Sequence, residues 1–388
     1  MQKNLLFIPG PVTVAEAVLA AMMQPLIDHR GRRFAELLAR IVERMRPIFG
    51  THGDVLVLTG SGTGGLEAAV TSMFGPGDTL LACPIGVFGQ RFIELAKMSG
   101  CAVEVLETPW GGCVDPAALE ERLRADAGKR ITGVLLTQNE TSTGAQNDMA
   151  ALARATREHG AYVVVDAVSG LGAAEFRMDE WGFDVVVTAS QKVLAAPPGL
   201  AMVAVAERAW TKIESNRGPR FYFDLRRARD FAALGQTPWT PAVPVVYALD
   251  TALDLFEKEG DVNVRRRHER YARAIRAALG ALDVDVYSRD GAHSVTVVAA
   301  NVPAGIDGDA VRARLRDERG LTLGGGQKEL KGKIVRIGTM GDLSQTDILG
   351  MIGALEIVLL EAGHALQLGF GGKAALEIFL AEGLTVPA

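Results

Sequence analysis

The stretch Asp184-Val185-Val186-Val187-Thr188-Ala189-Ser190-Gln191-Lys192 carries the feature that decides the fold, an apolar run that ends in a lysine. Its consecutive valines predict a strand that is covered on both faces. A turn, Ala195-Ala196-Pro197-Pro198-Gly199, follows directly. A second apolar run, Tyr162-Val163-Val164-Val165, ends at an acid, Asp166. A charged residue at the end of each of two buried strands indicates a site for chemistry at one edge of a sheet.

A lysine and an aspartate at neighbouring strand ends are the pair that a pyridoxal 5'-phosphate (PLP) site requires. PLP is held through an imine on a lysine amine, and it acts as an electron sink when a carboxylate keeps its ring nitrogen protonated. Lys192 and Asp166 suit these two roles. A lysine at a strand end is, by itself, more often a residue of the sheet rim, so the interpretation depends on the surrounding motifs.

Apolar runs of strand length alternate with helical segments from residue 54 to about residue 207. The runs are 55–58, 80–82, 103–106, 134–136, 163–165, 185–187 and 202–205. This alternation predicts an α/β fold with a mostly parallel seven-stranded sheet flanked by helices. The helices expected between the strands are 64–73, 88–98, 116–124 and 149–158, with Asp115 and Asp148 as N-caps.

The pattern changes after residue 244, which predicts a second and smaller unit. Two long helices are expected at 245–259 and 262–279. Strands at 294–301 and 334–337 then alternate with helices at 308–317 and 345–362, which predicts an α+β unit. We therefore expect a large cofactor-binding domain at 15–255 and a small domain at 256–366, with segment 1–14 packing near the small domain. Residues 367–388 form a tail that is either a docked last helix or a mobile end.

Composition excludes several classes of protein. The chain has 388 residues, with 48% hydrophobic and 22% charged residues, a globular balance with length enough for two domains. A net charge of -5 gives no case for binding nucleic acid. The first apolar run, Leu5 to Ile8, is too short for a signal peptide, so we expect a cytoplasmic protein without membrane association. The three cysteines have no CxxC spacing, which argues against disulfides and metal centres.

A glycine-rich turn, Thr59-Gly60-Ser61-Gly62-Thr63-Gly64-Gly65, follows the first strand and opens a helix. Small residues at such a position bring backbone amides up to a phosphate. The turn matches GxGxxG, but the next strand ends at Ala82 without an acid for a ribose hydroxyl, which disfavours a dinucleotide and hence a nicotinamide-dependent dehydrogenase. A GK[ST] ending is absent too, which disfavours a nucleoside triphosphate. A small phosphate cradle remains, with tight packing alone as the alternative.

Two further turns follow strands of the same sheet. Ile85-Gly86-Val87-Phe88-Gly89-Gln90-Arg91 places Phe88 where it can lie over the ring of the cofactor, although a core phenylalanine fits the spacing equally well. Gln138-Asn139-Glu140-Thr141-Ser142-Thr143-Gly144 offers hydroxyl groups for the cofactor, with a simple polar turn as the alternative.

These motifs, in this order, resemble the class V aminotransferases, PLP enzymes of fold type I that include alanine-glyoxylate, serine-glyoxylate and serine-pyruvate transaminases. The resemblance covers nearly the whole chain. It is carried by Pro9-Gly10-Pro11, His29-Arg30, Ser61-Gly62-Thr63, Asn139-Glu140-Thr141-Ser142-Thr143-Gly144, Asp166-Ala167-Val168-Ser169, Ser190-Gln191-Lys192 and Arg336-Ile337-Gly338. Seven ordered matches are far more specific than any one of them.

The resemblance implies a role for each matched residue. Lys192 is implied as the lysine that holds the cofactor and Asp166 as the partner of its ring nitrogen, so these two are the expected catalytic residues. The implied cofactor-binding residues are Ser61, Gly62, Thr63, Phe88, Thr141, Asp166, Val168, Gln191, Lys192 and Thr237. Arg336 is implied to grip the carboxylate of the substrate, with Gly10 beside it. Thr237, in Gln236-Thr237-Pro238-Trp239-Thr240-Pro241, matches the segment that reaches the phosphate of a neighbouring subunit, which implies a homodimer with shared sites.

Substrate identity is open at this stage. Thr339 stands where family members often have a histidine, and the loop Gly324-Gly325-Gly326-Gln327-Lys328 lies near the expected substrate side. No extra arginine is evident for a second acidic group. The expected reaction moves an amino group from alanine, serine or aspartate to glyoxylate or pyruvate by a ping-pong mechanism. The alternatives are a cysteine desulfurase, which needs a reactive late cysteine and usually a histidine where Gln191 stands, and a non-catalytic relative that serves as a subunit or scaffold.

Overall fold

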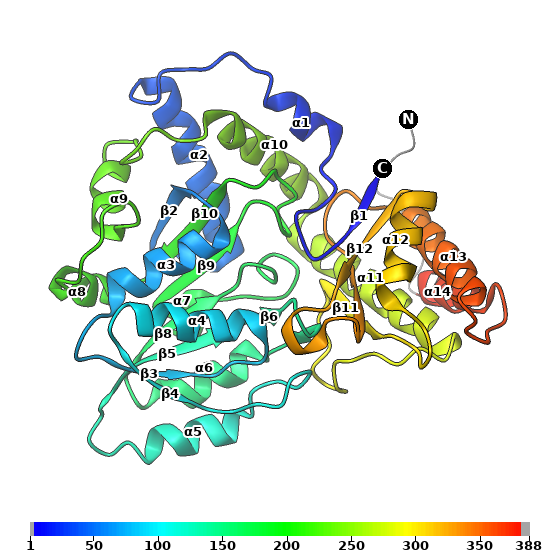
Figure 1. Ribbon diagram of the computed structural model, residues 1–388. Helices are drawn as coiled ribbons and strands as arrows, with labels where there is room; N and C mark the ends of the chain where they lie inside the picture. The colour runs from blue at the N-terminus through cyan, green and yellow to red at the C-terminus, as the bar shows by residue number, and fades with distance from the viewer. Residues whose placement is uncertain (1–3, 382–388) are drawn as a thin grey trace.

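A seven-stranded sheet forms the centre of the larger part of the molecule (Figure 1). The computed structural model describes residues 4–381, and the strand order of this sheet is β2-β10-β9-β8-β5-β3-β4. Its strands are β2 (Asp54–Thr59), β3 (Thr79–Ala82), β4 (Ala102–Val105), β5 (Ile131–Thr137), β8 (Tyr162–Asp166), β9 (Val185–Ala189) and β10 (Leu200–Val205). Only β10 runs against its neighbours. The prediction of a mostly parallel α/β sheet is confirmed.

Helices cover both faces of this sheet, which explains why its central strands are apolar at consecutive positions. On one face α3 (Gly62–Met73), α4 (Val87–Met98), α8 (Glu207–Ser215) and α9 (Leu225–Ala232) share a core with the strands. On the other face the core includes α1 (Glu16–Ala21), α2 (Arg32–Phe49), α5 (Pro116–Arg124), α6 (Met149–Arg157), α7 (Met178–Trp181) and α10 (Val243–Glu259). The valines of β9 are fully buried between these two layers.

The expected N-caps are confirmed, whereas one long helix was missed. Asp115 accepts a hydrogen bond from Ala117 N, and Asp148 accepts one from Ala151 N. Helix α2 has no counterpart among the predicted helices, although its buried residues recur at helical spacing. Pro47 in its last turn and the many arginines along it obscured that signal.

A second sheet of four strands, in the order β1-β12-β13-β11, forms the smaller part of the molecule. Its strands are β1 (Leu5–Phe7), β11 (Val297–Asn301), β12 (Leu321–Gly325) and β13 (Ile334–Gly338). The helices that pack on it are α11 (Asp261–Ala281), α12 (Gly308–Arg319), α13 (Gln345–Glu361) and α14 (Phe370–Ala381), and the short 3-10 helix η1 (Lys328–Leu330) follows β12. This mixed unit confirms the predicted smaller α+β part.

The small sheet differs from the sequence expectation at two strands. β12 was not predicted, and β1 at the start of the chain pairs in parallel with it, Leu5 opposite Leu321. A three-residue strand gives little periodicity, so only the partner strand reveals it. The domain limits at 255 and 366 stay a prediction, and residues 1–3 and 382–388 of the expected terminal segments lie outside the described residues.

The last described helix is docked by a buried carboxylate. Glu356, on α13, is 3% exposed, and its two oxygens accept hydrogen bonds from Gly369 N and Gly372 N at the start of α14. A negative charge at a helix N-terminus satisfies free amides and the helix dipole together. Of the two alternatives predicted for the tail, residues 370–381 therefore form a docked helix.

Within the described part of the chain, no helix is long and apolar enough to cross a membrane.

Replacing Glu356 with glutamine should loosen the last helix. The variant puts an amide where a carboxylate accepts from two backbone N–H groups, so we expect the free energy of local opening of residues 370–381 to fall by about 1–3 kcal/mol. Native-state hydrogen exchange of α14 measures this, with Glu377→Gln on the exposed side of the same helix as the control. Unchanged protection in Glu356→Gln would contradict the capping role.

Candidate active site

Polar loops gather at one edge of the large sheet because its parallel strands end there together. β8 and β9 pair in parallel with Asp166 opposite Val187, so the carboxylate and the segment leading to Lys192 leave adjacent strands on the same side. The loop after β5 joins them through the hydrogen bond from Gln138 N to the carbonyl of Asp166, at 2.8 Å. The strand ends of the sheet thus bring together the two residues that the sequence singled out.

Lys192 is held by the beginning of the chain. Its Nζ donates a hydrogen bond to the carbonyl of Pro9. Gly10 has a φ of +118°, and a Cβ atom at this position would lie 2.6 Å from the lysine Nζ. Both the backbone conformation and the space therefore require glycine there. Burial lowers the pKa of Lys192 to about 8, although the charge of Asp166 works in the opposite direction.

Asp166 is a buried carboxylate, 3% exposed. Burial raises its pKa to about 7, although one oxygen accepts a hydrogen bond from Val168 N at 2.9 Å. The charge of Glu140 raises this pKa further, whereas Lys192 and Arg91 lower it. No arginine or lysine of the described residues forms an ion pair with Asp166, so Val168 N is its direct partner and cations act on its charge only at a distance.

The glycine-rich turn packs closely against the Asp166 loop. Ser61 is the N-cap of α3, but its side chain makes no capping hydrogen bond, so the first amides of the helix are left for another acceptor. A Cβ atom on Gly62 would lie 2.9 Å from Val168, which explains the need for glycine. Gln191 also has a buried Oε1 without a hydrogen-bond partner among residues 4–381. The cradle thus combines free amides with an unsatisfied side chain.

Glu140 organises the Phe88 loop, a role that sequence reasoning missed. This fully buried carboxylate accepts hydrogen bonds from Phe88 N and Gly89 N in the first turn of α4, and from the amide and hydroxyl of Ser142. Burial raises its pKa, although these hydrogen bonds work against the shift. An acid within an otherwise hydroxyl-rich turn was the available signal, because such a residue needs strong donors when it is buried.

Arg336, on β13 of the small sheet, reaches across to the large one. Its Nε donates to the carbonyl of Gly325 and its Nη1 to the carbonyl of Thr141, at 2.8 and 2.9 Å. The second terminal nitrogen, Nη2, has no hydrogen bond within residues 4–381. Burial lowers the pKa of Arg336 to about 10, and the charge of Glu140 opposes that shift. The guanidinium is thus fixed in orientation with one donor left free.

A buried polar network joins the loops that follow β5 and β8 to the segment that precedes β11. Asn139 donates to Ser169 Oγ and to Thr296 Oγ1, at 2.8 and 2.9 Å, and it accepts from Ser294 Oγ. Thr339 is fully buried next to this network, and its hydroxyl donates to the carbonyl of Val295. The Thr339 hydroxyl is therefore engaged with the backbone just before β11.

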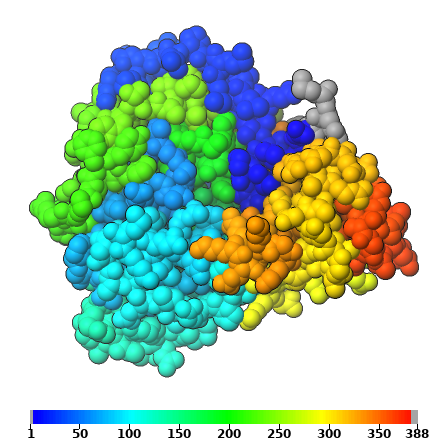
Figure 2. Space-filling model, in the orientation of Figure 1, coloured from blue at the N-terminus to red at the C-terminus, as the bar shows by residue number. Residues whose placement is uncertain are grey.

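The loop that follows β12 crosses from the small domain onto α4. Lys328 Nζ lies 3.5 Å from Gln90 Oε1 and 3.6 Å from a carboxylate oxygen of Glu94. Figure 2 shows this orange segment against the cyan part of the large domain. Gly325, the last residue of β12 directly before this loop, accepts the hydrogen bond from Arg336 Nε. The loop thus ties α4 to the strand that carries Arg336.

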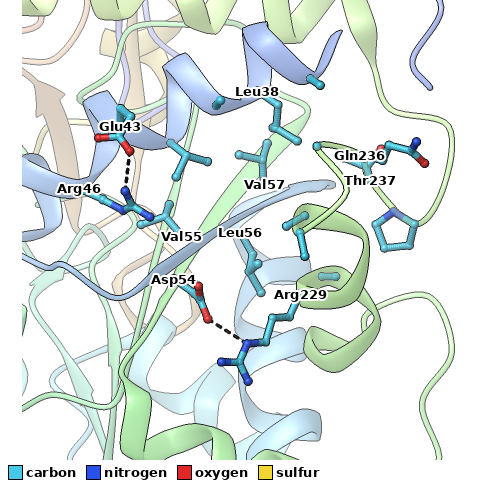
Figure 3. Close-up of a pocket in the computed structure, with 18 residues that line it drawn as sticks. Leu38, Glu43, Arg46, Asp54, Val55, Leu56, Val57, Arg229, Gln236 and Thr237 are labelled. Carbon is cyan, nitrogen blue, oxygen red and sulfur yellow. Dashed lines mark hydrogen bonds and ion pairs between the residues drawn. The ribbon is translucent and has the colours of Figure 1, made fainter. Parts of the chain in front are cut away.

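Thr237 lies apart from the other expected site residues. It lines a cavity of about 330 Å³ between α2, β2 and α9, together with Leu38, Val57 and Arg229 (Figure 3). Its hydroxyl donates to the carbonyl of Trp239, and no hydrogen bond within residues 4–381 links it to Lys192 or Asp166. This cavity contains none of the other expected cofactor-binding residues. Within residues 4–381, Thr237 is therefore separate from the residues around Lys192.

Arg30 holds the segment that contains Thr237. Its Nη1 donates to the carbonyl of Thr237 and to Gln236 Oε1, both at 2.8 Å, and its Nη2 donates to the carbonyl of Pro238. The guanidinium also lies 5.1 Å from the ring centroid of Phe231. The matched pair His29-Arg30 is thus connected with the Thr237 segment.

Within the described residues, no group of three or more His, Cys, Asp or Glu side chains is arranged to hold a metal ion.

Comparison with known proteins agrees with this geometry. The family model of aminotransferase class-V matches residues 15–340. The soluble hydrogenase 42 kDa subunit of Anabaena cylindrica is 39% identical over 97% of this chain and 99% of its own length. The L-aspartate-glyoxylate aminotransferase of Paracoccus denitrificans is 38% identical over 97% of this chain and 96% of its own. Both alignments run along nearly the entire chain.

A solved structure extends the comparison to the fold. The pyridoxamine-pyruvate aminotransferase from Mesorhizobium loti superimposes with a TM-score of 0.93 at 31% identity, covering 99% of this chain and 98% of that one. Proteins of this family typically bind PLP. On the family match, the identity of these relatives and the shared fold-type I architecture, the chain belongs to the class V aminotransferases.

Proposed function

We propose that this protein is a PLP-dependent aminotransferase that moves an amino group from a small amino acid to a 2-oxo acid such as glyoxylate or pyruvate. The observation that carries the proposal is the pair formed by Lys192 and Asp166 at adjacent strand ends. Asp166 is buried and Lys192 is half-buried, and both have pKa values shifted toward neutrality, Lys192 to about 8 and Asp166 to about 7. Groups with such values exchange protons readily near neutral pH.

The described residues fit the cofactor. Asp166 is a buried carboxylate without an ion-pair partner, so a protonated ring nitrogen would relieve the cost of its charge. The free amides of the α3 turn suit a phosphate monoester. The unpartnered Oε1 of Gln191 is an acceptor, so it suits a donor group next to the phosphate and not the phosphate oxygens themselves. In this proposal Ser61, Gly62, Thr63, Gln191 and Val168 surround the cofactor. Phe88 covers its ring, and Thr141 supplies a hydroxyl.

The chain's own residues divide the work of the reaction. PLP, when bound, supplies an electron sink that stabilises negative charge at Cα of the amino donor. Arg336, already oriented by two carbonyl groups, binds the carboxylate of the donor through its free nitrogen. Lys192 Nζ removes the proton from Cα, because burial leaves much of its amine neutral near pH 8. Gly10 leaves room for that amine to move.

The printed names of the relatives support small donors and a glyoxylate acceptor. L-Aspartate-glyoxylate and serine-glyoxylate aminotransferases are among the proteins that match this chain along almost its whole length. We therefore propose alanine, serine or aspartate as the donor and glyoxylate or pyruvate as the acceptor. We expect ping-pong kinetics, because the 2-oxo acid formed from the donor leaves, and the amino group stays with the protein, before the acceptor binds to the same arginine.

We also propose a homodimer with shared sites. Thr237 sits on a segment held by Arg30 and lines a cavity without the Lys192 cluster, which suits a residue that serves a second copy of the chain. The residue then completes the phosphate cradle of the neighbouring subunit.

Two other functions compete with this proposal. A cysteine desulfurase needs a reactive thiol, but burial raises the pKa of Cys83 to about 12 and that of Cys101 to about 11, and the exposed Cys113 lies early in the chain. A role as a non-catalytic subunit is favoured by one observation, the hydrogenase-subunit name of the relative from Anabaena cylindrica. The retention of Lys192, Asp166 and Arg336 favours catalysis.

Replacing Lys192 with alanine tests the proposed function directly. The variant lacks the amine that moves the proton, so we expect amino-group transfer to fall by at least about 10²–10⁴-fold. The assay follows transfer from L-alanine, L-serine and L-aspartate to glyoxylate. Lys97→Ala, on the exposed end of α4, is the control and should keep normal turnover. Normal turnover by Lys192→Ala would refute the proposal, and a wild-type protein that transfers no amino group and binds no PLP would support the subunit alternative.

Replacing Arg336 with lysine should separate binding from chemistry. Lysine keeps the charge but not the planar fork, so we expect KM for the donor to rise by about 10- to 100-fold, with a smaller effect on kcat. Steady-state kinetics with the preferred donor measure both constants, with the exposed Arg316→Lys as the control. An unchanged KM would show that Arg336 does not bind the donor carboxylate.

Asp166 should control how the stability of the cofactor-free protein depends on pH. Its pKa is raised from 3.8 to about 7, so between these values the folded protein binds more protons than the unfolded chain, and the free energy of unfolding falls as pH rises. Asp166→Asn removes that decline, which amounts to at most about 1.4 kcal/mol per pH unit. The lowered pKa of Lys192 acts in a separate window, between about 8 and 10.5.

Urea unfolding of the cofactor-free wild type and of Asp166→Asn across this pH range measures the effect. The exposed Asp230→Asn serves as the control and should follow the wild type. If the free energies of unfolding of wild type and Asp166→Asn change with pH in the same way, the pKa of Asp166 is not raised. The electrostatic argument for the site would then be wrong.

A further inference from the structure

Arg91 is a half-buried cation for which the described residues provide no acidic partner. It lies on α4, one turn after Phe88, and its guanidinium carbon is 4.7 Å from the centroid of the Phe88 ring. Its Nη1 donates a hydrogen bond of 2.8 Å to Thr63 Oγ1 in the first turn of α3. No carboxylate within residues 4–381 forms an ion pair with it. The sequence placed Arg91 in the Phe88 turn but gave it no role, because its contact with Thr63 depends on α3 and α4 lying side by side.

The charge of Arg91 acts on the same site as Lys192 and Asp166. It is close enough to lower the pKa of both groups. Within residues 4–381 the buried Asp166 forms no ion pair with Arg91, and the fully buried Glu140 is occupied by the amides of α4 and by Ser142. A cation in this position is left with a surplus of positive charge, which a bound anion would neutralise.

The proposed phosphate cradle needs such a charge. A phosphate monoester carries close to two negative charges at neutral pH. The cradle residues Ser61, Gly62, Thr63 and Gln191 carry no formal charge. The amides of α3 contribute only the partial charge of a helix end. The hydrogen bond from Arg91 to Thr63 places a full positive charge against this turn.

We infer that Arg91 is a positioning residue that supplies the counter-charge for the phosphate of the cofactor through Thr63 and the first turn of α3, and that it fixes the Phe88 ring at the same time. This inference rests on the proposed function, because it assumes that the site binds PLP. The planar guanidinium suits both tasks, since it can stack on an aromatic face while its edge donates to the hydroxyl.

The test compares two ligands that differ only in the phosphate. Cofactor-free protein is titrated with pyridoxal 5'-phosphate and with pyridoxal, and binding is followed by quenching of intrinsic fluorescence. In Arg91→Gln we expect affinity for pyridoxal 5'-phosphate to fall by about 10- to 100-fold, with a change of less than about 3-fold for pyridoxal. Arg91→Lys should be intermediate, because it keeps the charge. Lys97→Gln, a change of charge on the same helix, should leave both affinities unchanged.

The Phe88→Ala variant provides the contrast. Loss of the stacking ring should weaken both ligands to a similar extent, since both contain the ring of the cofactor. Thermal unfolding of each cofactor-free variant checks that it is folded, and Arg91→Lys carries the comparison if Arg91→Gln does not fold. The ratio of the two affinities is the decisive quantity, because a purely structural role for Arg91 would not change it.

Two outcomes would overturn the inference. If Arg91→Gln weakens both ligands equally, Arg91 acts only through Phe88 or the fold. If both affinities are unchanged while KM rises for L-aspartate and not for L-alanine, Arg91 binds a second acidic group of the donor instead. A wild-type protein that does not bind pyridoxal 5'-phosphate refutes the proposed function itself, so the failure of the two proposals can be distinguished.

Discussion

The parallel pairing of β8 with β9 is the constraint on which the site depends. It sets Asp166 opposite Val187 and so brings the aspartate and Lys192 out at one edge of the sheet. Because side chains alternate between the two faces of a sheet, a slip of one residue would turn the side chain of Asp166 to the opposite face relative to β9. The register therefore fixes the chemistry. Burial at this edge brings the pKa values of the two groups close together, to about 7 and about 8.

A second requirement is that distant parts of the chain close over this edge. The carbonyl of Pro9 comes from the N-terminal segment, which is anchored by β1 in the small sheet. Arg336 comes from β13 of the same sheet and is held by a carbonyl of the large domain. The network around Asn139 ties the two parts together with buried hydrogen bonds, which are costly to leave unsatisfied. The small domain thus positions groups that the large sheet cannot supply.

The cofactor groups and the substrate groups lie in different parts of the fold, which explains why the sequence identifies the family more readily than the substrate. Groups that suit the cofactor lie at the ends of buried strands, where register leaves them little freedom. Groups that we propose to face the donor, such as Arg336, depend on contacts between the small sheet and the β5 loop, which local sequence does not encode. Relatives with similar overall identity accordingly carry different names, among them an aspartate-glyoxylate enzyme and a hydrogenase subunit.

The sequence by itself determined the parallel sheet, the smaller α+β part and the caps of α5 and α6, because apolar periodicity and capping are local. It also identified Lys192 and Asp166 as residues at strand ends. Only the tertiary structure revealed that Glu140 holds the start of α4, that Arg91 has no acidic partner within residues 4–381, and that β1 completes the small sheet. Each of these depends on contacts between segments far apart in the chain. Burial and charge balance arise from such contacts, and no local pattern encodes them.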